Sequence, residues 1–384
     1  MTDVARPIYP RELEIWWLET ARKKLDVPVS AAALDILESD VAKLSDGFTT
    51  DRAAGFGDYA ADKNMLLAYG LFFFPQTFVR TLFQFDEIVH RCGWRAPSGR
   101  AAKIADLGSG SGSAGFALAS RLAKNSEVEL TAIESSSASL AFAQSIAREH
   151  FPNVKFQTRN ESLLGFAEGT YDIIIASFSL NECFHNKTDA EFDAWTDRVF
   201  ARLSDGGLLL ISEPALKSSS ERLERLRDRI SAAGKFSVLA PCLHHRACPL
   251  RAAKGETFCH EVRSWKPPSS LQKLNSKLFR AVHLLKYSFV AIAKCPPKPA
   301  EISAERARLV SPMMNLKGRV QADGCAADGA IRRYEMLTRK FETADKHAFL
   351  KTERGDIVRW KNLSLLGDKQ THRAEGAARE FGFS

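Results

Sequence analysis

Three of the seven cysteines in this chain lie within 18 residues of one another, at Cys242, Cys248 and Cys259. Cysteines are seldom paired as disulfides in a reducing compartment, so a local group of thiols indicates a metal site or catalysis. Prolines flank the first two cysteines in the stretch APCLHHRACPL and would stiffen it. The first gap holds five residues, more than the about two to four that usually begin a structural zinc site. The spacing therefore indicates thiolate ligands without selecting the metal.

A metal centre built on these thiolates needs a fourth ligand from elsewhere in the chain. The residues leave the choice open between another cysteine and a nearby histidine. The candidates are Cys325 in ADGCAADG, Cys295 at the end of an expected strand, and His244, His245 and His260.

A second chemical motif is the glycine-rich stretch IADLGSGSGSAG, which follows an apolar strand pattern and precedes a helical one. Gly108, Gly110 and Gly112 allow a sharp turn and a close approach of the backbone to a ligand. The unpaired N–H groups at the start of the following helix can then bind a polar or anionic group. The glycines alone also fit a dinucleotide loop, so they do not choose the cofactor.

Two acids beside this loop favour S-adenosylmethionine. Asp106 stands two residues before the first glycine, and Glu134 ends the next strand, where a carboxylate would accept the ribose hydroxyls. With these acids, the stretch resembles the class I S-adenosylmethionine-dependent methyltransferase fold over roughly residues 100–295. The resemblance implies a cofactor site made of Asp106, Gly108, Gly110, Gly112 and Glu134.

The sequence names no catalytic residue. Methyl transfer from a sulfonium depends mainly on alignment, so an acceptor site leaves a faint signature. The stretch after the fourth expected strand reads SFSLNECF rather than Asn-Pro-Pro-Tyr. Cys183 in that stretch lacks the motif of a cytosine-methylating nucleophile, and Cys242 follows too late a strand for that role.

Short apolar runs alternate with helical stretches from residue 102 onward. This alternation predicts an α/β fold with a doubly wound, Rossmann-like parallel sheet. Strands are expected at 102–108, 128–134, 154–160, 171–179, 206–214, 235–240 and 286–294, and helices at 114–125, 137–150, 189–203, 219–234 and 270–283.

The chain divides into three parts by composition and periodicity. Apolar residues three and four apart predict a helical N-terminal region within residues 1–98. The methyltransferase-like domain follows at 99–298 and carries a cysteine-bearing basic insertion at 240–265. After the proline-rich linker PPKPA, residues 299–384 are expected to form a small β-containing segment that ends in a polar tail.

The net charge of +8 is unevenly distributed along the chain. Residues 1–234 hold 26 Lys/Arg against 32 Asp/Glu, whereas residues 235–298 hold 12 against 2. Such an excess of bases around the cysteines indicates a polyanionic partner, and we expect RNA. The alternative is an ordinary solvated face, although such faces usually mix both signs.

The chain shows no stretch of the roughly 18–20 apolar residues that span a bilayer, and LLAYGLFFF is too short. The first residues include early acids and no apolar segment of a signal peptide. We therefore expect a cytoplasmic protein with no membrane partner, monomeric when free.

The cysteine motifs carry a more specific resemblance. APCLHHRACPL and FCHEVR, followed by LKGRVQADGC and TERGDIVRW, resemble the methyltransferase-like mitochondrial small-ribosomal-subunit protein family and its bacterial relatives, over about residues 60–360. The family implies a methyltransferase core, a 4Fe–4S cluster bound by four cysteines, and a role in small-subunit assembly and translation. Carried over by position, the ligands are Cys242, Cys248, Cys259 and Cys325.

Three functions are compatible with these features. The first is an S-adenosylmethionine-dependent methyltransferase that acts on ribosomal RNA of the small subunit. The second is a non-catalytic assembly factor that keeps the fold and the cluster. The third is a small-molecule methyltransferase with a structural zinc, which the basic segment disfavours. The intact pair of Asp106 and Glu134 favours the first function over the second.

Overall fold

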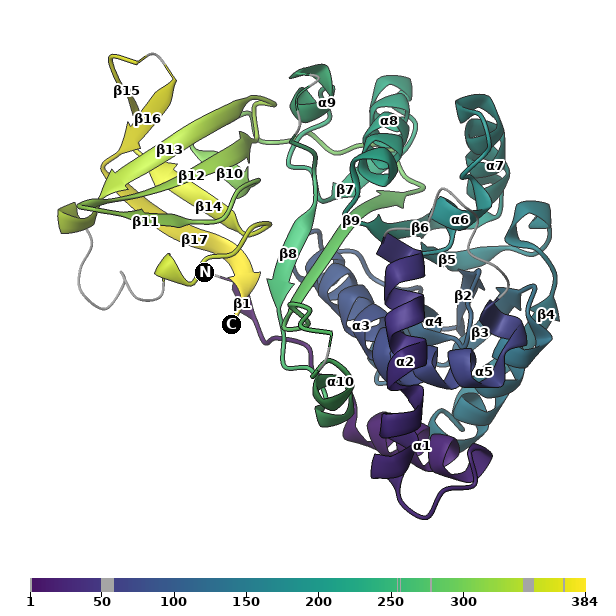
Figure 1. Cartoon of the computed structure of the whole chain (residues 1–384). Helices are drawn as coiled ribbons and strands as arrows, with labels where there is room; N and C mark the ends of the chain where they lie inside the picture. Colours follow the sequence, from purple (N-terminus) through teal and green to yellow (C-terminus); the bar gives the residue numbers. More distant parts are fainter. Residues whose placement is uncertain are drawn as a thin grey trace.

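A computed structural model describes residues 2–49, 59–253, 255, 257–276, 278–340, 349–368 and 370–384. Within these residues the chain forms two sheets, one with eight strands and one with nine. Figure 1 shows the first sheet enclosed by helices and the second, coloured light green to yellow, standing beside it. The expected α/β fold is confirmed.

The N-terminal part of the chain is helical, as expected. It contains α1 (Arg11–Lys24), α2 (Ser30–Thr49), a 3₁₀ turn at Tyr59–Ala61 and α3 (Lys63–His90). The carboxylate of Asp62 starts α3, because it accepts hydrogen bonds from the N–H groups of Asn64 and Met65.

Among the described residues, α3 is the one helix long and apolar enough to cross a membrane by length and composition alone. Its most apolar window is 83% buried inside the protein, and a core helix passes the same test. The helix therefore gives only weak support for a membrane span.

The central sheet has the strand order β4-β3-β2-β5-β6-β9-β7, with β8 paired to β9. Strands β2 to β6 are parallel, whereas β9 is antiparallel to β6, β7 and β8. The expected doubly wound sheet is thus parallel from β4 to β6 and antiparallel at the edge formed by β7, β8 and β9. The strands are β2 (Ala102–Leu107), β3 (Val128–Glu134), β4 (Val154–Asn160), β5 (Tyr171–Ser177), β6 (Leu203–Pro214), β7 (Ser237–Ala240), β8 (Glu261–Ser264) and β9 (Leu284–Ala293).

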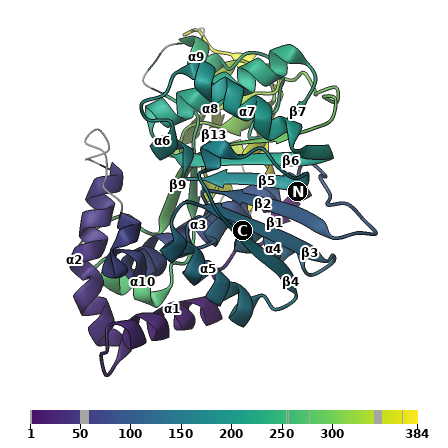
Figure 2. The same ribbon diagram turned by 90° about the vertical axis from the view of Figure 1, so that its right-hand side faces the viewer.

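Helices cover both faces of this sheet, as Figure 2 shows, with α6, α7 and α8 on one side and α3, α4 and α5 on the other. Alternate residues of β5 serve the two faces: Ile173 and Ile175 join one core, and Ile174 joins the other. This is the doubly wound arrangement. The helices are α4 (Ser113–Leu122), α5 (Ser137–His150), α6 (Leu180–Cys183), α7 (Asp189–Ala201), α8 (Lys217–Ala233), α9 (Pro249–Ala253) and α10 (Ser269–Leu274).

The expected helix at 270–283 is much shorter in the structure, because α10 ends at Leu274 and the strand β9 already begins at Leu284. The side chain of Asn275 binds the backbone of Arg280 at both its N–H and its carbonyl group. These side-chain bonds replace helical ones and turn the chain into β9.

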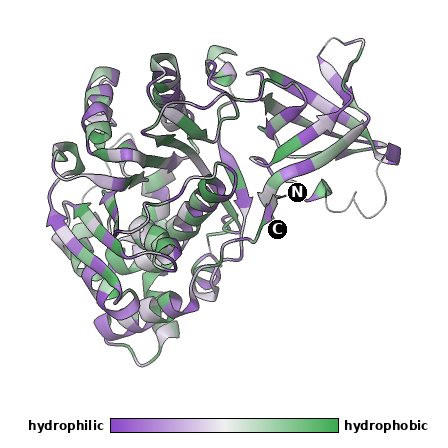
Figure 3. Cartoon of the chain, turned by 180° about the vertical axis from the view of Figure 1, so that it is seen from behind, coloured by the Kyte–Doolittle hydropathy of each residue, from purple (hydrophilic) through white to green (hydrophobic). Residues whose placement is uncertain are grey.

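The second sheet has the order β1-β17-β14-β10-β12-β13-β16-β15, with β11 paired to β12. Its strands carry polar and apolar bands, as Figure 3 shows, and the apolar faces meet around Tyr334 and Trp360. Their rings stack with centroids 5.1 Å apart. The strands are β1 (Thr2–Val4), β10 (Arg306–Leu309), β11 (Met314–Leu316), β12 (Arg319–Ala326), β13 (Ile331–Leu337), β14 (Ile357–Lys361), β15 (Ser364–Leu365), β16 (Thr371–Ala374) and β17 (Gly376–Phe383).

The polar tail expected at the end of the chain is instead the strand β17. It pairs with β14 and, in parallel, with β1, so that Thr2 lies opposite Phe381. The two ends of the described chain therefore meet in one sheet (Figure 1). Phe83 of α3 packs edge-on against Phe383, with ring centroids 4.8 Å apart, and this contact ties the end of β17 to the central domain.

A buried ionic cluster joins the two sheets. The guanidinium of Arg308, on β10, binds Glu87 of α3 at 2.7 Å and Glu261 of β8 at 2.9 Å. Arg263 of β8 also binds Glu261 and reaches Asp356, just before β14. All five residues are at most 3% exposed. We call this group the interdomain clamp; buried charges of this kind are stable only as partners of one another.

Candidate cofactor and metal sites

The glycine loop leaves β2 at Leu107 and enters α4 at Ser113. Gly108 has φ +68°, and a Cβ there would lie 2.5 Å from the Cβ of Ser179, so only glycine fits the turn. Gly110 has φ +53° with open space around its Cα hydrogen position. The loop thus presents backbone, rather than side chains, to the space above the strand ends.

Asp106 lies near the end of β2, beneath this loop, and is 1% exposed. Its carboxylate accepts a hydrogen bond of 2.8 Å from the N–H of Gly115. Burial raises the pKa of Asp106 to about 7; the Gly115 hydrogen bond opposes this shift, and the charge of Glu134 adds to it. The carboxylate has no cationic partner among the described residues, so a cationic ligand group would stabilise its charged form.

Glu134 lies at the end of β3, on the neighbouring strand. One carboxylate oxygen accepts the N–H of Gly110 at 2.9 Å, and the other accepts the N–H of Ser136 at 2.9 Å. The second oxygen also accepts the hydroxyl of Ser135 at 3.2 Å, whereas the first keeps a further lone pair that can accept a hydroxyl hydrogen. Asn160 ends the next strand, β4, and its amide donates to the carbonyl groups of Glu134 and Ser135. The ends of β2, β3 and β4 thus meet at one edge of the sheet.

The stretch SFSLNECF closes the same edge from the far side. The hydroxyl of Ser179 donates to the carbonyl of Leu107, next to the glycine loop. Phe178 has φ +61°, a strained conformation for a bulky residue and one that often occurs at functional sites. Burial, with a smaller contribution from neighbouring acids, raises the pKa of Cys183 to about 12, so its thiol is a poor nucleophile.

Glu213 at the end of β6 holds this stretch in place, and the sequence did not single it out. Its carboxylate accepts the N–H groups of Leu180 at 3.1 Å and Asn181 at 2.9 Å. The side chain is 2% exposed, and burial raises its pKa to about 8 despite these two bonds. A polar residue at the end of a long apolar strand was the available signal.

The four cysteines of the predicted metal set come from separate elements. Cys242 follows β7, Cys248 precedes α9, Cys259 precedes β8, and Cys325 lies on β12 of the second sheet. Cys248, Cys259 and Cys325 pack around one small apolar cluster that includes Leu250 and Val310. The second sheet thus brings Cys325 to the cysteine loop of the first.

The electrostatics of the thiols also show their proximity. The pKa of Cys248 is raised to about 12, mainly by burial and to a smaller extent by the charges of Glu224 and Cys242. Burial and then the charges of Cys242 and Cys248 raise the pKa values of Cys259 and Cys325. The raised pKa values keep the thiols of Cys248, Cys259 and Cys325 protonated unless a cationic centre binds them.

Helix α8 positions the cysteine loop through three buried or half-buried side chains that the sequence did not single out. Glu224 accepts the N–H of Cys259 at 2.8 Å, and Asp228 accepts the N–H of Cys248 at 2.8 Å. Arg227 donates to the sulfur of Cys242 at 3.3 Å. Their i, i+3 and i+4 spacing on a charged helix was the signal that could have identified a functional face.

The other candidate ligands are distributed unequally. His244 lies against the cysteines, with its Nε2 atom 3.4 Å from the sulfur of Cys325. Burial, followed by the charge of Arg227, lowers the pKa of His244 to about 4. His260 binds the carbonyl of Phe258 through its Nδ1 atom, and Cys295 lies beyond the end of β9.

No group of three or more His, Cys, Asp or Glu side chains within the described ranges is arranged to hold a single metal ion. A tetrahedral zinc site would need sulfur atoms only about 4 Å apart, given Zn–S bonds of about 2.3 Å. A cubane spaces its ligands more widely, because each thiolate binds a different iron. The cysteines are near one another without forming a compact single-ion site.

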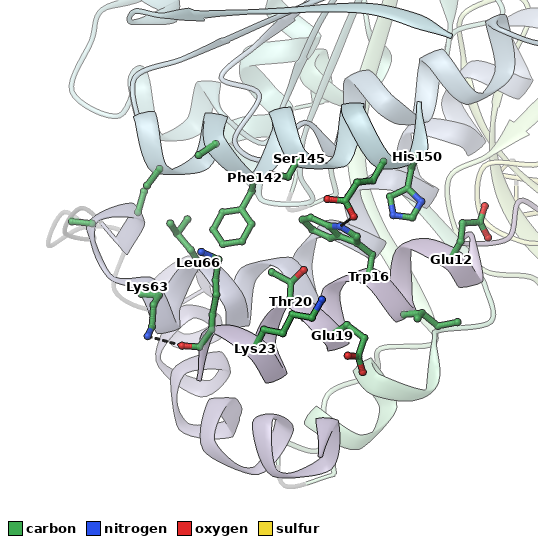
Figure 4. A pocket seen from close by; sticks show the side chains of 17 residues that line it. Glu12, Trp16, Glu19, Thr20, Lys23, Lys63, Leu66, Phe142, Ser145 and His150 are labelled. Carbon is green, nitrogen blue, oxygen red and sulfur yellow. Dashed lines mark hydrogen bonds between the residues drawn. The ribbon is translucent and has the colours of Figure 1, made fainter. Parts of the chain in front are cut away.

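A hollow of about 900 Å³ lies elsewhere, between α1, the start of α3 and α5. Figure 4 shows Trp16 and Phe142 in its wall, with Lys63 at one end and His150 at the other. The indole N–H of Trp16 donates to Glu149 at 2.9 Å and closes one side. Neither the glycine loop nor the cysteines line this hollow.

The bases of residues 235–298 are divided between the interior and the surface. Arg263 belongs to the interdomain clamp, and its charge is neutralised there by Glu261 and Asp356. Arg246 and Arg251 are exposed on either side of Cys248. Arg251 also lies 3.5 Å from Asp228, whereas exposed lysines at 235, 266, 286 and 298 have no ion-pair partner among the described residues.

Several solved methyltransferase structures are similar to this chain, all at low identity. Magnesium protoporphyrin IX methyltransferase from Synechocystis PCC 6803 with bound SAM is 14% identical, with 66% of this chain and 97% of that chain covered and a TM-score of 0.35. A methyltransferase from Pyrococcus furiosus is 16% identical, with 56% and 84% covered and a TM-score of 0.33.

No curated protein sequence matches the chain at a significant level. A family match, in contrast, extends over residues 63–368, from the start of α3 to the loop before β16. It includes the glycine loop, all four predicted cysteine ligands and most of the second sheet. This span is most of the chain, and the chain therefore belongs to the family described as mitochondrial small ribosomal subunit Rsm22.

Proposed function

We propose that this protein binds S-adenosylmethionine in the loop between β2 and α4 and acts on or with the RNA of the small ribosomal subunit. Asp106 would receive the amino group of the cofactor, and Glu134 the ribose hydroxyls. The open backbone at Gly110 gives the ligand room. The family match supports a ribosomal partner. The chain would act where that ribosome is assembled, in the cytoplasm expected from the sequence or in a mitochondrion.

We further propose that Cys242, Cys248, Cys259 and Cys325 bind a 4Fe–4S cluster. The donor set fits such a cluster, since four thiolates are its usual complement and the electrostatics favour a cationic centre. When bound, the cluster would tie β12 to the loop after β7. The chain's own residues keep the loop in shape for it, because Glu224 and Asp228 bind its backbone.

The single observation that carries this proposal is the packing of Cys325 against Cys248 and Cys259 across the two sheets. Cys325 lies far from the other two in the sequence, and incidental thiols have no reason to meet. Two alternatives remain. A non-catalytic assembly factor would keep both sites without transferring a methyl group, and a small-molecule methyltransferase would carry a structural zinc.

Metal analysis of the anaerobically purified protein tests the proposal. We expect about four iron and four acid-labile sulfide per chain in the wild type and a loss of most of both in Cys325→Ser. Cys295→Ser is the matched control, because this half-buried cysteine lies outside the cluster, and it should keep wild-type iron content.

One zinc per chain in place of iron would support the small-molecule methyltransferase with a structural metal. Full iron content in Cys325→Ser would show that Cys325 is not a ligand, and His244 would become the next residue to replace. A protein without any metal would refute the cluster and leave only the cofactor site.

A further inference from the structure

One half-buried cation at the cofactor edge lacks a counter-ion among the described residues. Arg80 lies on α3, and its guanidinium carbon is 4.7 Å from the centre of the Phe178 ring. One terminal nitrogen donates to Gln76 at 3.1 Å, and the buried Nε atom has no hydrogen-bond partner. Among the described carboxylates, none lies within ion-pair distance of this guanidinium. A desolvated, unpaired arginine is costly for a folded protein.

A neighbouring pair shows how this fold treats an ordinary arginine. Arg121 of α4 binds Asp86 of α3 through two parallel hydrogen bonds of 2.8 Å each. Arg80 is on the same helix as Asp86 and has no such partner. The difference indicates that its partner is supplied from outside the chain.

The location of Arg80 identifies the site it faces. Phe178, on which the guanidinium stacks, precedes Ser179, and Ser179 contacts the glycine loop at Gly108. Tyr69 also lies on α3. The charges of Arg80, Asp106 and Glu134 all act on its hydroxyl group. The hydroxyl of Ser113, at the end of the glycine loop, also donates to the carbonyl of Phe74 on α3 at 2.7 Å, so the helix that carries Arg80 packs against the loop that Asp106 supports.

These two opposite charges do not pair with each other, although both act electrostatically on the same tyrosine, Tyr69. Burial without a counter-ion lowers the pKa of Arg80 to about 10 and raises that of Asp106 to about 7. Two separated, unlike charges that each lack a partner are complementary to a zwitterion. The amino-acid end of S-adenosylmethionine is such a group.

Building on the proposed cofactor site, we propose that Arg80 binds the α-carboxylate of S-adenosylmethionine while Asp106 receives its α-ammonium group. A planar guanidinium binds a carboxylate through two parallel hydrogen bonds, and the terminal nitrogens of Arg80 would donate them, because its Nε atom is enclosed by the protein. Arg80 is thus a specificity residue: it distinguishes the complete cofactor from analogues without the carboxylate.

Calorimetric titration with three ligands tests this role. S-Adenosylmethionine carries both charges of the amino-acid end, decarboxylated S-adenosylmethionine lacks only the carboxylate, and 5′-methylthioadenosine lacks both. For Arg80→Met we expect the affinity for S-adenosylmethionine to fall about 10- to 100-fold, as for a lost charge-assisted hydrogen bond. The affinities for the other two ligands should change less than about 3-fold. The affinity of Arg80→Lys for S-adenosylmethionine should lie between those of the wild type and Arg80→Met. Lysine keeps the positive charge but lacks the paired, planar donors of the guanidinium.

Arg121→Met is the matched control, since it removes a paired arginine from the same helix interface. It should lower the melting temperature of the free protein and leave the ligand preference unchanged. Arg80→Met should not lower that temperature, because it removes an uncompensated charge.

Equal losses for all three ligands would overturn the assignment and make Arg80 a structural residue. Unchanged affinity for S-adenosylmethionine with weaker RNA binding would overturn it in favour of a phosphate contact. A wild-type protein that binds none of the three ligands would refute the cofactor proposal itself, and this inference with it.

Discussion

The glycine loop and the cysteine site are built in opposite ways. The loop, with Asp106 and Glu134, arises from two adjacent strands and the turn between β2 and α4, all within about 30 residues of sequence. The cysteine site needs α8, the loop after β7 and a strand of the second sheet. A site of the first kind survives loss of distant contacts, whereas one of the second kind depends on domain docking.

The two sites are alike in one respect. Each holds buried groups whose charges lack a partner inside the protein: Asp106 and Arg80 at the loop, and thiols that raise one another's pKa at the cysteine site. Such groups cost stability in the free protein and favour ligand binding in return.

The largest expected effect comes from breaking the clamp that joins the sheets. Arg308→Met leaves Glu87 and Glu261 buried with one cation fewer, so the free energy of unfolding should fall by about 3–5 kcal/mol. Denaturant unfolding measures this change. Iron content should fall with it, because Cys325 loses its docked position, while S-adenosylmethionine affinity should stay within about 2-fold of wild type.

The control for this prediction is Arg333→Met, on the same sheet. Arg333 binds Asp323 at 2.9 Å, but the two side chains are 47% and 31% exposed. Its loss should cost less than about 1 kcal/mol. An Arg308→Met protein with full iron and near wild-type stability would show that docking does not control the cysteine site.

Gly108→Ala should have the opposite pattern of effects: it should impair the cofactor site and spare the cysteine site. A methyl group at φ +68°, 2.5 Å from the Cβ of Ser179, should lower the free energy of unfolding by about 2–3 kcal/mol and abolish measurable cofactor binding. Iron content should be unchanged. Gly206→Ala is the control, because Gly206 has a similar φ of +74° but no neighbour within 4 Å of a Cβ. Its free energy of unfolding should fall by only about 1 kcal/mol, from backbone strain alone. Equal effects of the two variants would contradict the role of the close contact.

The smallest predicted effect is a pH dependence confined to the loop. The pKa of Asp106 is about 7 in the folded protein and about 3.8 ordinarily, so its contribution to stability is greatest below pH 4 and is lost as the pH rises through 7. A bound α-ammonium favours the ionised form. Affinity for S-adenosylmethionine should therefore rise about 10-fold between pH 5.5 and pH 7.

The same titration with 5′-methylthioadenosine should be flat, because this ligand has no ammonium group. Asp106→Asn should remove the slope for S-adenosylmethionine as well. A slope that persists in that variant would assign the titration to another group, and Glu213, with a pKa raised to about 8, would be the next to test.

Much of the fold follows from local sequence patterns. The expected strands at 128–134 and 154–160 and the helix at 137–150 have the same bounds in the structure. Apolar periodicity is a short-range property, and capping residues such as Ser136 mark the ends within a few residues. The glycine loop belongs to the same class, because its strand, turn and helix are consecutive.

Other features required contacts between distant residues. The parallel pairing of β1 with β17, the antiparallel β9, the short α10 and the contacts of α8 with the cysteine loop were not evident from local patterns. In these elements, strand pairing and helix length depend on contacts with distant residues. A three-residue strand such as β1 is too short for its hydrophobic pattern to predict which strand it pairs with.

The sequence by itself determined the types of group present: a glycine turn flanked by acids, and cysteines in number and order for a metal centre. Tertiary structure decided which of them meet. It brought Cys325 to Cys248 and Cys259 through the interdomain clamp, and it left Arg80 unpaired beside Asp106. The physical reason is that residue chemistry is carried by each side chain alone, whereas burial and charge pairing exist only between neighbours in space.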